Sequence, residues 1–308
     1  MQSAVIRIGT RGSPLALAQA EEVKRRLHAA EALAPDAALI VPIRTTGDRI
    51  TDRPLADAGG KGLFTKEIDE ALIAGSIDLA VHSAKDLPTR LVPGIAIAAC
   101  LPRADVRDAF ISQTAGTLAE LPKGAALGTS SLRRQAMALR IRPDLRIVGL
   151  RGNVETRLRR IGEGAADATL LAAAGLTRLG LLSSARSLIE PDEWLPAVGQ
   201  GIIVITARAG DAATAARLAP IDHHDSSVAL HTERAFLDVL DGSCRTPIGG
   251  LAVLSGGAVW FRGIIVAADG SRAHATERRG AIGDAAALGA DAGAELRRQG
   301  GPDFFAGG

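Results

Sequence analysis

The sequence repeats one pattern, a short apolar strand that leads directly into a helix, first near the N-terminus and again after Arg103. Residues 5–9 and 125–128 are such strands, and serine or threonine follows each of them at the start of the next helix. Strands that alternate with helices predict a mostly parallel sheet covered by helices. Because the pattern occurs twice, we expect two similar α/β lobes.

The turn Thr10-Arg-Gly-Ser-Pro-Leu15 is the first of these strand-to-helix connections. Ser13 is a favourable N-cap and Pro14 suits the first helical position. Free backbone N–H groups at a helix N-terminus favour an anion, and Arg11 adds a cation beside them. A single turn of this kind is weak support for a binding site, since surface arginines are common.

Arginine recurs at the corresponding turns of the second half. Arg133 and Arg134 follow one turn, and Arg151 and Arg157 flank the next, where Asn153 is the expected N-cap. Guanidinium groups form bidentate pairs with carboxylates, so three such turns in two similar halves favour one shared site for a polyanion. A solvated surface is the alternative interpretation of the same arginines.

Residues 82–86, His-Ser-Ala-Lys-Asp, follow a buried strand and are expected to form a loop. Pro88 disfavours helix at the residue before it. Open α/β sheets bind their ligands at the carboxyl ends of their strands, which is where this loop would lie. Ser83, Lys85 and Asp86 are therefore candidate binding or catalytic groups, and a salt-bridged structural turn is the alternative.

Two glycine-rich segments indicate motion. Residues 59–64, Gly-Gly-Lys-Gly-Leu-Phe, are expected to form a mobile lid with Lys61 and Phe64, and they lack the P-loop pattern, which argues against nucleotide binding. Residues 195–201 are the expected hinge and include Gln200. The next strand, 202–206, could return to the first lobe's sheet, and two crossings would allow a cleft to close by hinge motion.

The C-terminal part of the chain is expected to form a small α/β unit around Cys244. Its expected elements are strands at 251–254, 258–267 and 272–278 and a helix at 284–298. Cys244 lies in a turn after small residues that leave its sulfur accessible, and Arg245 beside it could favour the nucleophilic thiolate. An unreactive loop cysteine is the alternative.

Composition argues against several function classes. The net charge of +2 over 308 residues, with 3% aromatic residues and no tyrosine, argues against nucleic-acid binding. No apolar run approaches the roughly 18 residues of a membrane span.

The sequence shows no leader and Cys100 lies in an apolar run, so we expect a cytoplasmic protein without disulfides. His223, His224 and His231 lack further ligands at metal-binding spacing, so we expect no metal.

Seven segments, in order, resemble motifs of the porphobilinogen deaminase family, also called hydroxymethylbilane synthase. They are Thr10-Arg-Gly-Ser-Pro-Leu-Ala-Leu17, Gly59-Gly-Lys-Gly-Leu-Phe64, His82-Ser-Ala-Lys-Asp86, Gly128-Thr-Ser-Ser-Leu-Arg-Arg-Gln135, Leu150-Arg-Gly-Asn153, Leu195-Pro-Ala-Val-Gly-Gln-Gly201 and Gly242-Ser-Cys-Arg-Thr-Pro-Ile-Gly249. They cover the chain nearly end to end, so the resemblance is highly specific.

The resemblance implies a transferase that condenses four porphobilinogen molecules, with release of ammonia, into the linear tetrapyrrole hydroxymethylbilane in haem and chlorophyll biosynthesis. It implies an α/β fold of two periplasmic-binding-protein-like lobes with a hinge and a third, smaller α/β domain. The expected boundaries are 1–100 plus 200–218, then 101–199, then 219–308. We expect a monomer that binds porphobilinogen and binds neither nucleic acid nor membrane.

Carried over motif by motif, the resemblance also implies a dipyrromethane cofactor held by a thioether on Cys244, with Asp86 as the catalytic carboxylate. The other cofactor-binding residues would be Ser83, Lys85, Thr129, Ser131, Arg133 and Arg134. The substrate-binding residues would be Arg11, Ser13, Arg151 and Arg157. Lys61 and Phe64 would belong to a mobile loop, and Gln200 to the hinge.

The residue types suit this chemistry. Each pyrrole unit bears an acetate and a propionate, so a growing chain accumulates negative charge that arginines can hold. Loss of ammonia leaves a cation that a fixed carboxylate at Asp86 would stabilise, and the same group could assist proton transfers. Three departures from the family pattern, Asp57, Ser243 and Arg245, bear on the lid and on the surroundings of the cysteine.

Two other functions compete with this interpretation. A non-catalytic, two-lobed anion-binding protein would use the arginines and the hinge but would leave Cys244 and Asp86 without a role. A cysteine acyltransferase would need a histidine base near the thiol, and the sequence identifies none.

Overall fold

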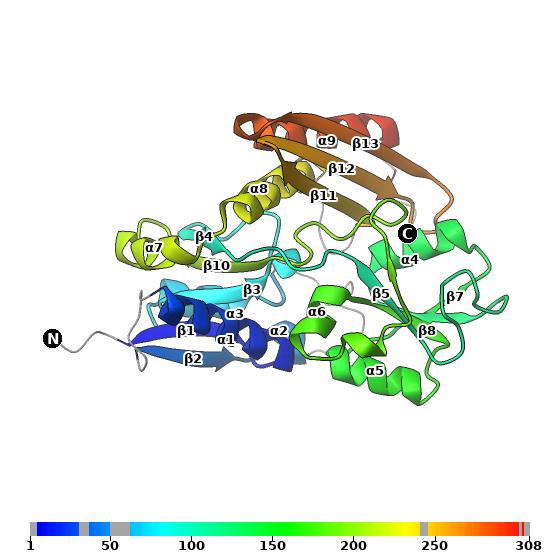
Figure 1. Cartoon of the computed structure of the whole chain (residues 1–308), viewed down its shortest axis with the longest axis horizontal. Coiled ribbons are helices and arrows are strands. Elements are labelled where there is room, and N and C mark those ends of the chain that lie inside the picture. Colours follow the sequence, from blue (N-terminus) through cyan, green and yellow to red (C-terminus); the bar gives the residue numbers. More distant parts are fainter. Residues whose placement is uncertain (1–4, 31–36, 50–61, 241–245, 302–303, 305–308) are drawn as a thin grey trace. The chain divides into compact units, whose positions relative to one another are not determined.

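A computed structural model describes residues 5–30, 37–49, 62–240, 246–301 and 304. The chain divides into two compact units, Met1–Ala104 with Ile202–Ser227, and Asp105–Gly201 with Val228–Gly308. Figure 1 labels most of their helices and strands. The three-domain boundaries proposed from the sequence remain a prediction.

The first unit contains a five-stranded sheet in the order β2-β1-β3-β10-β4. Its strands are β1 (Ile6–Arg11), β2 (Ala38–Ile43), β3 (Leu79–Ser83), β4 (Ile95–Cys100) and β10 (Ile203–Arg208). Strand β1 is parallel to β2 and β3, whereas β10 is antiparallel to β3 and β4. The expected return of the chain to the first lobe's sheet is therefore confirmed.

Helices α1 (Pro14–Ala29), α2 (Thr46–Arg49), α3 (Lys66–Ile73) and α7 (Ala212–Leu218) belong to this unit. Ser13 caps α1 by accepting a hydrogen bond from the Ala16 N–H, and Pro14 opens the helix, as predicted. The apolar face of α1 is buried, with Val23 and Leu27 inaccessible to solvent. The C-terminal end of β1 therefore leads directly into a capped and firmly packed helix.

The second unit begins with a five-stranded sheet in the order β7-β6-β8-β5-β9. Its strands are β5 (Asp108–Ser112), β6 (Ala126–Gly128), β7 (Arg146–Val148), β8 (Ala168–Ala172) and β9 (Ser187–Ile189). Strand β6 is parallel to β7 and β8, and β5 is antiparallel to β8 and β9. Helices α4 (Leu132–Ile141), α5 (Val154–Gly162) and α6 (Ala173–Arg178) accompany this sheet.

Both sheets have the same arrangement. In each sheet three parallel strands lie side by side, and the strand that comes first in the sequence, β1 or β6, is the middle one. An antiparallel strand, β10 or β5, follows them and separates them from the edge strand, β4 or β9. Asn153 caps α5 as predicted, by accepting a hydrogen bond from the Thr156 N–H at 2.8 Å. The expected α/β class with two similar lobes is confirmed, although the sequence pattern did not reveal β4, β5 or β9 as strands.

The second unit also contains an antiparallel sheet of β11 (Ile248–Ser255), β12 (Ala258–Val266) and β13 (Ala273–Ala281). Most of α8 (His224–Val239) and all of α9 (Ala285–Gly300) belong here. Phe236 of α8 and Phe261 of β12 are fully buried, with ring centroids 4.9 Å apart. These elements confirm the smaller third α/β part. No helix among the described residues is long and apolar enough to cross a membrane.

The contact between α8 and α9 requires glycine. A Cβ atom on Gly289 would lie 2.1 Å from the Thr232 carbonyl oxygen, which belongs to helix backbone and cannot move aside. We expect Gly289→Ala to lower the free energy of unfolding by about 1–3 kcal/mol, because the clash outweighs the better helix propensity of alanine. Urea unfolding measures the change. Gly162→Ala in α5 is the control, since its Cβ would meet only the Gln113 side chain at 3.7 Å. Equal stability of the two variants would contradict the prediction.

Candidate active site

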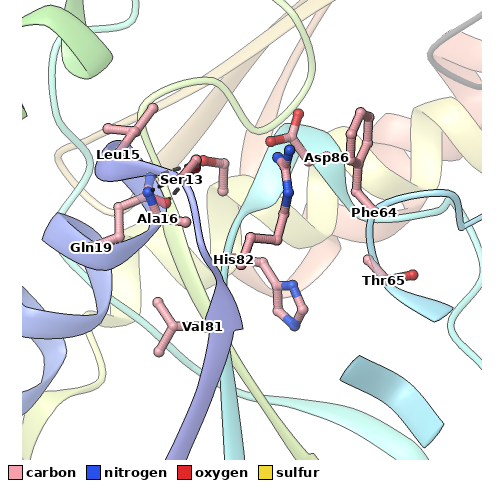
Figure 2. Close-up of a pocket in the computed structure, with 11 residues that line it drawn as sticks. Ser13, Leu15, Ala16, Gln19, Phe64, Thr65, Val81, His82 and Asp86 are labelled. Carbon is pink, nitrogen blue, oxygen red and sulfur yellow. Dashed lines mark hydrogen bonds between the residues drawn. The ribbon is translucent and has the colours of Figure 1, made fainter. Parts of the chain in front are cut away.

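A pocket in the first unit lies where β1 and β3 end (Figure 2). Arg11 is the last residue of β1, Ser83 is the last of β3, and Asp86 closes the short 3-10 helix Ala84–Asp86 that follows. The lining residues are Arg11, Ser13, Leu15, Ala16, Gln19, Phe64, Thr65, Val81, His82, Ser83 and Asp86. The structure thus brings together residues from three motifs that lie far apart in the sequence.

The guanidinium of Arg11 binds an internal carboxylate. Its Nε donates to Asp48 Oδ1 at 3.1 Å, and its Nη2 makes a second contact with the same oxygen. Thr45 Oγ1 also donates to Asp48, at 2.8 Å, and Phe64 lies against the guanidinium with its ring centroid 4.2 Å from Cζ. Burial raises the pKa of Asp48, but the hydrogen bonds from Arg11 and Thr45 outweigh it and hold this pKa below its usual value. Asp48 is therefore an anionic partner of Arg11.

Residues 82 and 83 do not form the expected loop, because β3 continues through Ser83. Strand β10 pairs with β3 up to this point, where Ile203 lies opposite Ser83 in the ladder. Ser83 Oγ accepts a hydrogen bond of 2.8 Å from Gln19 Nε2. His82 is buried, and its Nε2 lies 3.3 Å from Thr206 Oγ1. The pairing with β10 therefore fixes both side chains in a strand, and only residues 84–86 turn away from the sheet.

Burial next to Arg11 makes His82 a weak base. Desolvation is the main cause and the charge of Arg11 the second, and together they lower the pKa of His82 to about 4. The imidazole is therefore neutral at neutral pH and supplies no positive charge to the pocket. Asp86 is the carboxylate of the lining, half-buried at the end of its 3-10 helix, and Lys85 precedes it.

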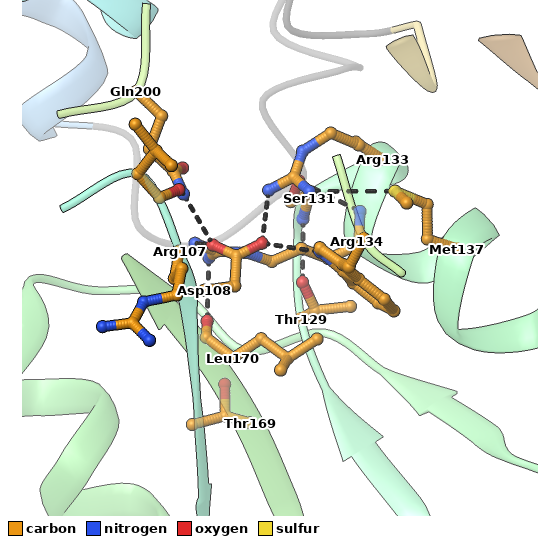
Figure 3. A network of polar contacts seen from close by, with 12 residues as sticks. Arg107, Asp108, Thr129, Ser131, Arg133, Arg134, Met137, Thr169, Leu170 and Gln200 are labelled. Carbon is orange, nitrogen blue, oxygen red and sulfur yellow. Dashed lines mark hydrogen bonds and ion pairs between the residues drawn. The ribbon is translucent and has the colours of Figure 1, made fainter. Parts of the chain in front are cut away.

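A second cluster lies in the second unit and is centred on Asp108, the first residue of β5 (Figure 3). Arg133 Nη2 donates to Asp108 Oδ2 at 2.6 Å, and Arg134 Nη2 donates to Oδ1 at 2.7 Å. Trp194 Nε1 and Gln200 Nε2 also donate to this carboxylate, at 2.8 and 3.0 Å. The two arginines expected to bind the cofactor are thus buried and share an internal carboxylate.

Burial acts in opposite directions on the pKa of the carboxyl group and on the pKa of a guanidinium group in this cluster. Burial alone would raise the pKa of Asp108, but the charges and hydrogen bonds of the two arginines hold it far below its usual value. The pKa of Arg133 is lowered, mainly by burial, although Asp108 counteracts this. Asp108 is therefore a permanent anion between two guanidinium groups.

The other predicted residues of the second unit lie near strand ends or helix starts. Ser131 caps α4 by accepting from the Arg134 N–H, and Thr129 is buried and accepts from the Ser131 N–H at 3.1 Å. Arg151 precedes α5 and is half-buried. Arg157, in the first turns of α5, donates from Nε to the Gly152 carbonyl oxygen at 2.8 Å. These positions match the predicted strand-to-helix turns.

The structure leaves part of the predicted site undescribed. Lys61 and Cys244 lie outside the described residues, as do the departures Asp57, Ser243 and Arg245. The remaining predicted residues fall into two sets, one in each unit. Arg11, Ser13, Phe64, Ser83, Lys85 and Asp86 belong to the first unit, and Thr129, Ser131, Arg133, Arg134, Arg151, Arg157 and Gln200 belong to the second.

Sequence reasoning missed the carboxylates that partner the arginines. Asp48 and Asp108 lie 37 and 25 positions from Arg11 and Arg133, and neither stands in one of the seven motif segments. One signal was available for Asp108. Two adjacent arginines at the start of a buried helix require a counter-charge, and Asp108 begins an apolar run.

The fold and the two clusters define a class of protein. This is an α/β protein whose strand-to-helix turns hold arginines suited to carboxylate-bearing ligands, with a carboxylate, Asp86, in one pocket. Two family profiles match. "Porphobilinogen deaminase, dipyromethane cofactor binding domain" matches residues 6–216, and "Porphobilinogen deaminase, C-terminal domain" matches residues 228–298.

Curated relatives agree with the profiles. A porphobilinogen deaminase of Nitrobacter winogradskyi is 59% identical over 97% of this chain and 94% of its own length. Another, of Paracoccus denitrificans, is 57% identical over 97% of this chain and 96% of its own. The chain belongs to the porphobilinogen deaminase family, as its motifs predicted.

A solved structure gives a more distant match. A periplasmic substrate-binding protein of an ABC transporter from Coxiella burnetii is 15% identical and covers 70% of this chain and 92% of its own, with a TM-score of 0.44. A score this low supports no inference about the chain.

The low pKa of His82 predicts a pH dependence of stability. The unfolded histidine has a pKa near 6.5 and the folded one about 4, so between these values the unfolded chain binds more protons. The contribution of His82 is therefore complete above pH 6.5 and is lost as the pH falls toward 4, by about 3 kcal/mol in all. We expect His82→Gln to reduce the loss of unfolding free energy between pH 7 and pH 5, measured by urea unfolding. Exposed His224→Gln is the control, and identical pH profiles for the wild type and His82→Gln would refute the prediction.

Proposed function

We propose that this chain condenses four porphobilinogen molecules, with loss of four ammonia molecules, into hydroxymethylbilane. The observation that supports this most strongly is family membership over nearly the whole chain, together with the carboxylate of Asp86 in a pocket at the ends of β1 and β3. We further propose that the enzyme is a cytoplasmic monomer and that a dipyrromethane cofactor is attached through Cys244.

The donor groups of the second unit fit such a cofactor. Dipyrromethane carries several carboxylates and therefore needs cations and N–H donors. The Nε atoms of Arg133 and Arg134 are buried and have no hydrogen-bond partner among the described residues. Arg133, Arg134, Thr129 and Ser131 would hold the cofactor here, and Ser83 and Lys85 are the corresponding candidates in the first unit. When bound, the cofactor supplies the pyrrole carbon to which the first substrate is joined.

Asp86 is the proposed catalytic carboxylate. When the C–N bond of the protonated aminomethyl group breaks, the electron pair leaves with ammonia and a cation remains, stabilised by the pyrrole nitrogen. A carboxylate held by the 3-10 helix Ala84–Asp86 would stabilise this charge as it develops. The imidazole of His82 does not oppose the cation, because its low pKa keeps it uncharged.

The proposed binding of substrate carboxylates falls to Arg11, Ser13, Arg151 and Arg157. Ser13 lies at the N-terminus of α1, where backbone N–H groups and the helix dipole favour an anion. Arg11 lies at the end of β1 and is held in place by Asp48 and Phe64. A substrate carboxylate that binds Arg11 would therefore share the guanidinium with Asp48 or displace it.

The cofactor proposal predicts an additional mass on the purified protein. We expect intact-mass spectrometry to show an excess equal to two linked pyrrole units, which Cys244→Ala removes together with the activity. Cys100→Ala is the matched control, because Cys100 is the other cysteine of the chain and is buried in β4. An active enzyme without the added mass would refute the attachment.

Removal of the Asp86 charge tests the catalytic role. We expect Asp86→Asn to lower kcat by about 100- to 1000-fold, as for the loss of one group that stabilises transition-state charge. The mass of the cofactor should remain, since its attachment point is unchanged. Steady-state kinetics with porphobilinogen and intact-mass spectrometry measure the two effects. A kcat near that of the wild type would remove Asp86 from catalysis.

A further inference from the structure

Asp108 accepts hydrogen bonds from four side chains, yet none of the seven motifs contains it. Its carboxylate is inaccessible to solvent and accepts from Arg133, Arg134, Trp194 and Gln200 at 2.6–3.0 Å. These donors come from α4 and from the segment between β9 and β10. One carboxylate therefore fixes two parts of the second unit.

Each arginine is held at two points. Arg133 Nη1 donates to the Leu195 carbonyl oxygen at 2.9 Å, and Arg134 Nη1 donates to the Leu170 carbonyl oxygen at 2.8 Å. With Nη2 of each on Asp108, neither guanidinium can rotate without breaking a buried hydrogen bond (Figure 3). Their orientation is set by the protein before any ligand binds.

The charges of the cluster do not balance. Among the residues that the structure describes, two guanidinium groups face one carboxylate, and the other partners in the cluster are an indole, an amide, backbone carbonyls and the Met137 thioether. Among the described residues, Asp108 is the only carboxylate that forms an ion pair with either arginine. Within the part of the chain that the structure describes, one positive charge of this buried cluster has no counter-charge, which is costly unless an anion compensates it. The two partnerless Nε atoms point to the same conclusion.

We propose that Asp108 is a positioning residue that fixes Arg133 and Arg134 and cancels one of their two charges, so that the pair receives a single carboxylate of the bound pyrrole chain. This inference rests on the proposed function, which supplies that carboxylate. A second carboxylate at the same pair would find no uncompensated positive charge, because the first would complete the charge balance. Asp108 thereby sets both the place and the number of carboxylates that this part of the site holds.

The same contacts extend the role of Asp108 to the connecting segment. Trp194 and Gln200 border residues 195–199, where the Gly199 N–H donates to Glu233 of α8 at 2.6 Å. Movement of Asp108 would therefore disturb the segment that joins the arginines to the C-terminal part of the unit. This makes a conservative substitution at Asp108 more informative than its removal.

Asp108→Glu is the first test, because it keeps the charge and moves the carboxylate by about one methylene. A displacement of about 1 Å in a positioned group can cost on the order of 100-fold in rate. We expect a folded enzyme that retains the cofactor mass, with kcat lowered about 10- to 100-fold and KM nearly unchanged, because the positioned chain is covalently attached. Asp144→Glu is the matched control, since Asp144 pairs with Arg142 in the same unit and is partly exposed. Activity of Asp108→Glu within about twofold of the wild type, or a loss confined to KM, would overturn the proposal.

The thermal stability of variants tests the proposed charge balance between Asp108 and the two arginines. Without a bound carboxylate, Asp108→Asn leaves two uncompensated guanidinium groups, whereas the double variant Asp108→Asn with Arg133→Gln leaves one. A bound carboxylate lowers both counts by one, so the difference between the two variants remains. We expect the double variant to unfold at a higher temperature than Asp108→Asn, or to fold where the single variant does not. If the double variant is no more stable than Asp108→Asn, the proposed charge balance is wrong. If Asp108→Glu does not fold, this comparison of stabilities is the test of the proposal. Wild-type protein that lacks the dipyrromethane mass would instead contradict the cofactor proposal. Failure of the cofactor proposal can therefore be distinguished from failure of the proposal for Asp108.

Discussion

Burial of guanidinium charge is the constraint on which the second unit depends. Arg133 and Arg134 lie on the inner side of α4, next to β5 and β8, and they can remain there only because Asp108 is ionised between them. Removing one partner of such a pair leaves a buried charge without compensation, which is far more costly than losing a surface salt bridge. The start of β5, the start of α4 and the segment that contains Trp194 are therefore mutually dependent.

The first unit uses a related arrangement in a more exposed setting. Arg11 also binds a carboxylate of the chain, that of Asp48, and Asp48 is also held by a hydrogen bond from Thr45. Both units thus place arginine at a strand-to-helix turn and pair it with an aspartate from elsewhere in the chain. The difference is stoichiometric, because Arg11 has an aspartate of its own, whereas Arg133 and Arg134 share one.

Local patterns were sufficient to predict most of the fold. Ser13, Pro14 and Asn153 gave helix starts correctly, because caps depend on residues within one turn. The return of β10 to the first sheet followed from a glycine-rich segment before an apolar strand. Strand β5 was missed because its apolar run is only three residues long and begins after Asp108, and this aspartate is buried only because two arginines from α4 neutralise it. The contacts of a site that depend on such distant partners cannot be inferred from spacing.

Arginine, rather than lysine, makes these arrangements possible. A guanidinium has five N–H donors in a rigid plane, so Arg133 binds Asp108 with one terminal nitrogen and the Leu195 carbonyl with the other and still retains its Nε–H. A lysine ammonium carries its three donors on a single nitrogen, so it could not offer separate nitrogens in a rigid plane to Asp108, to the Leu195 carbonyl and to a ligand. The predominance of arginine among the 36 basic residues is therefore more than a compositional bias at these turns. It allows internal carboxylates to orient the cations without exhausting their capacity to bind a ligand.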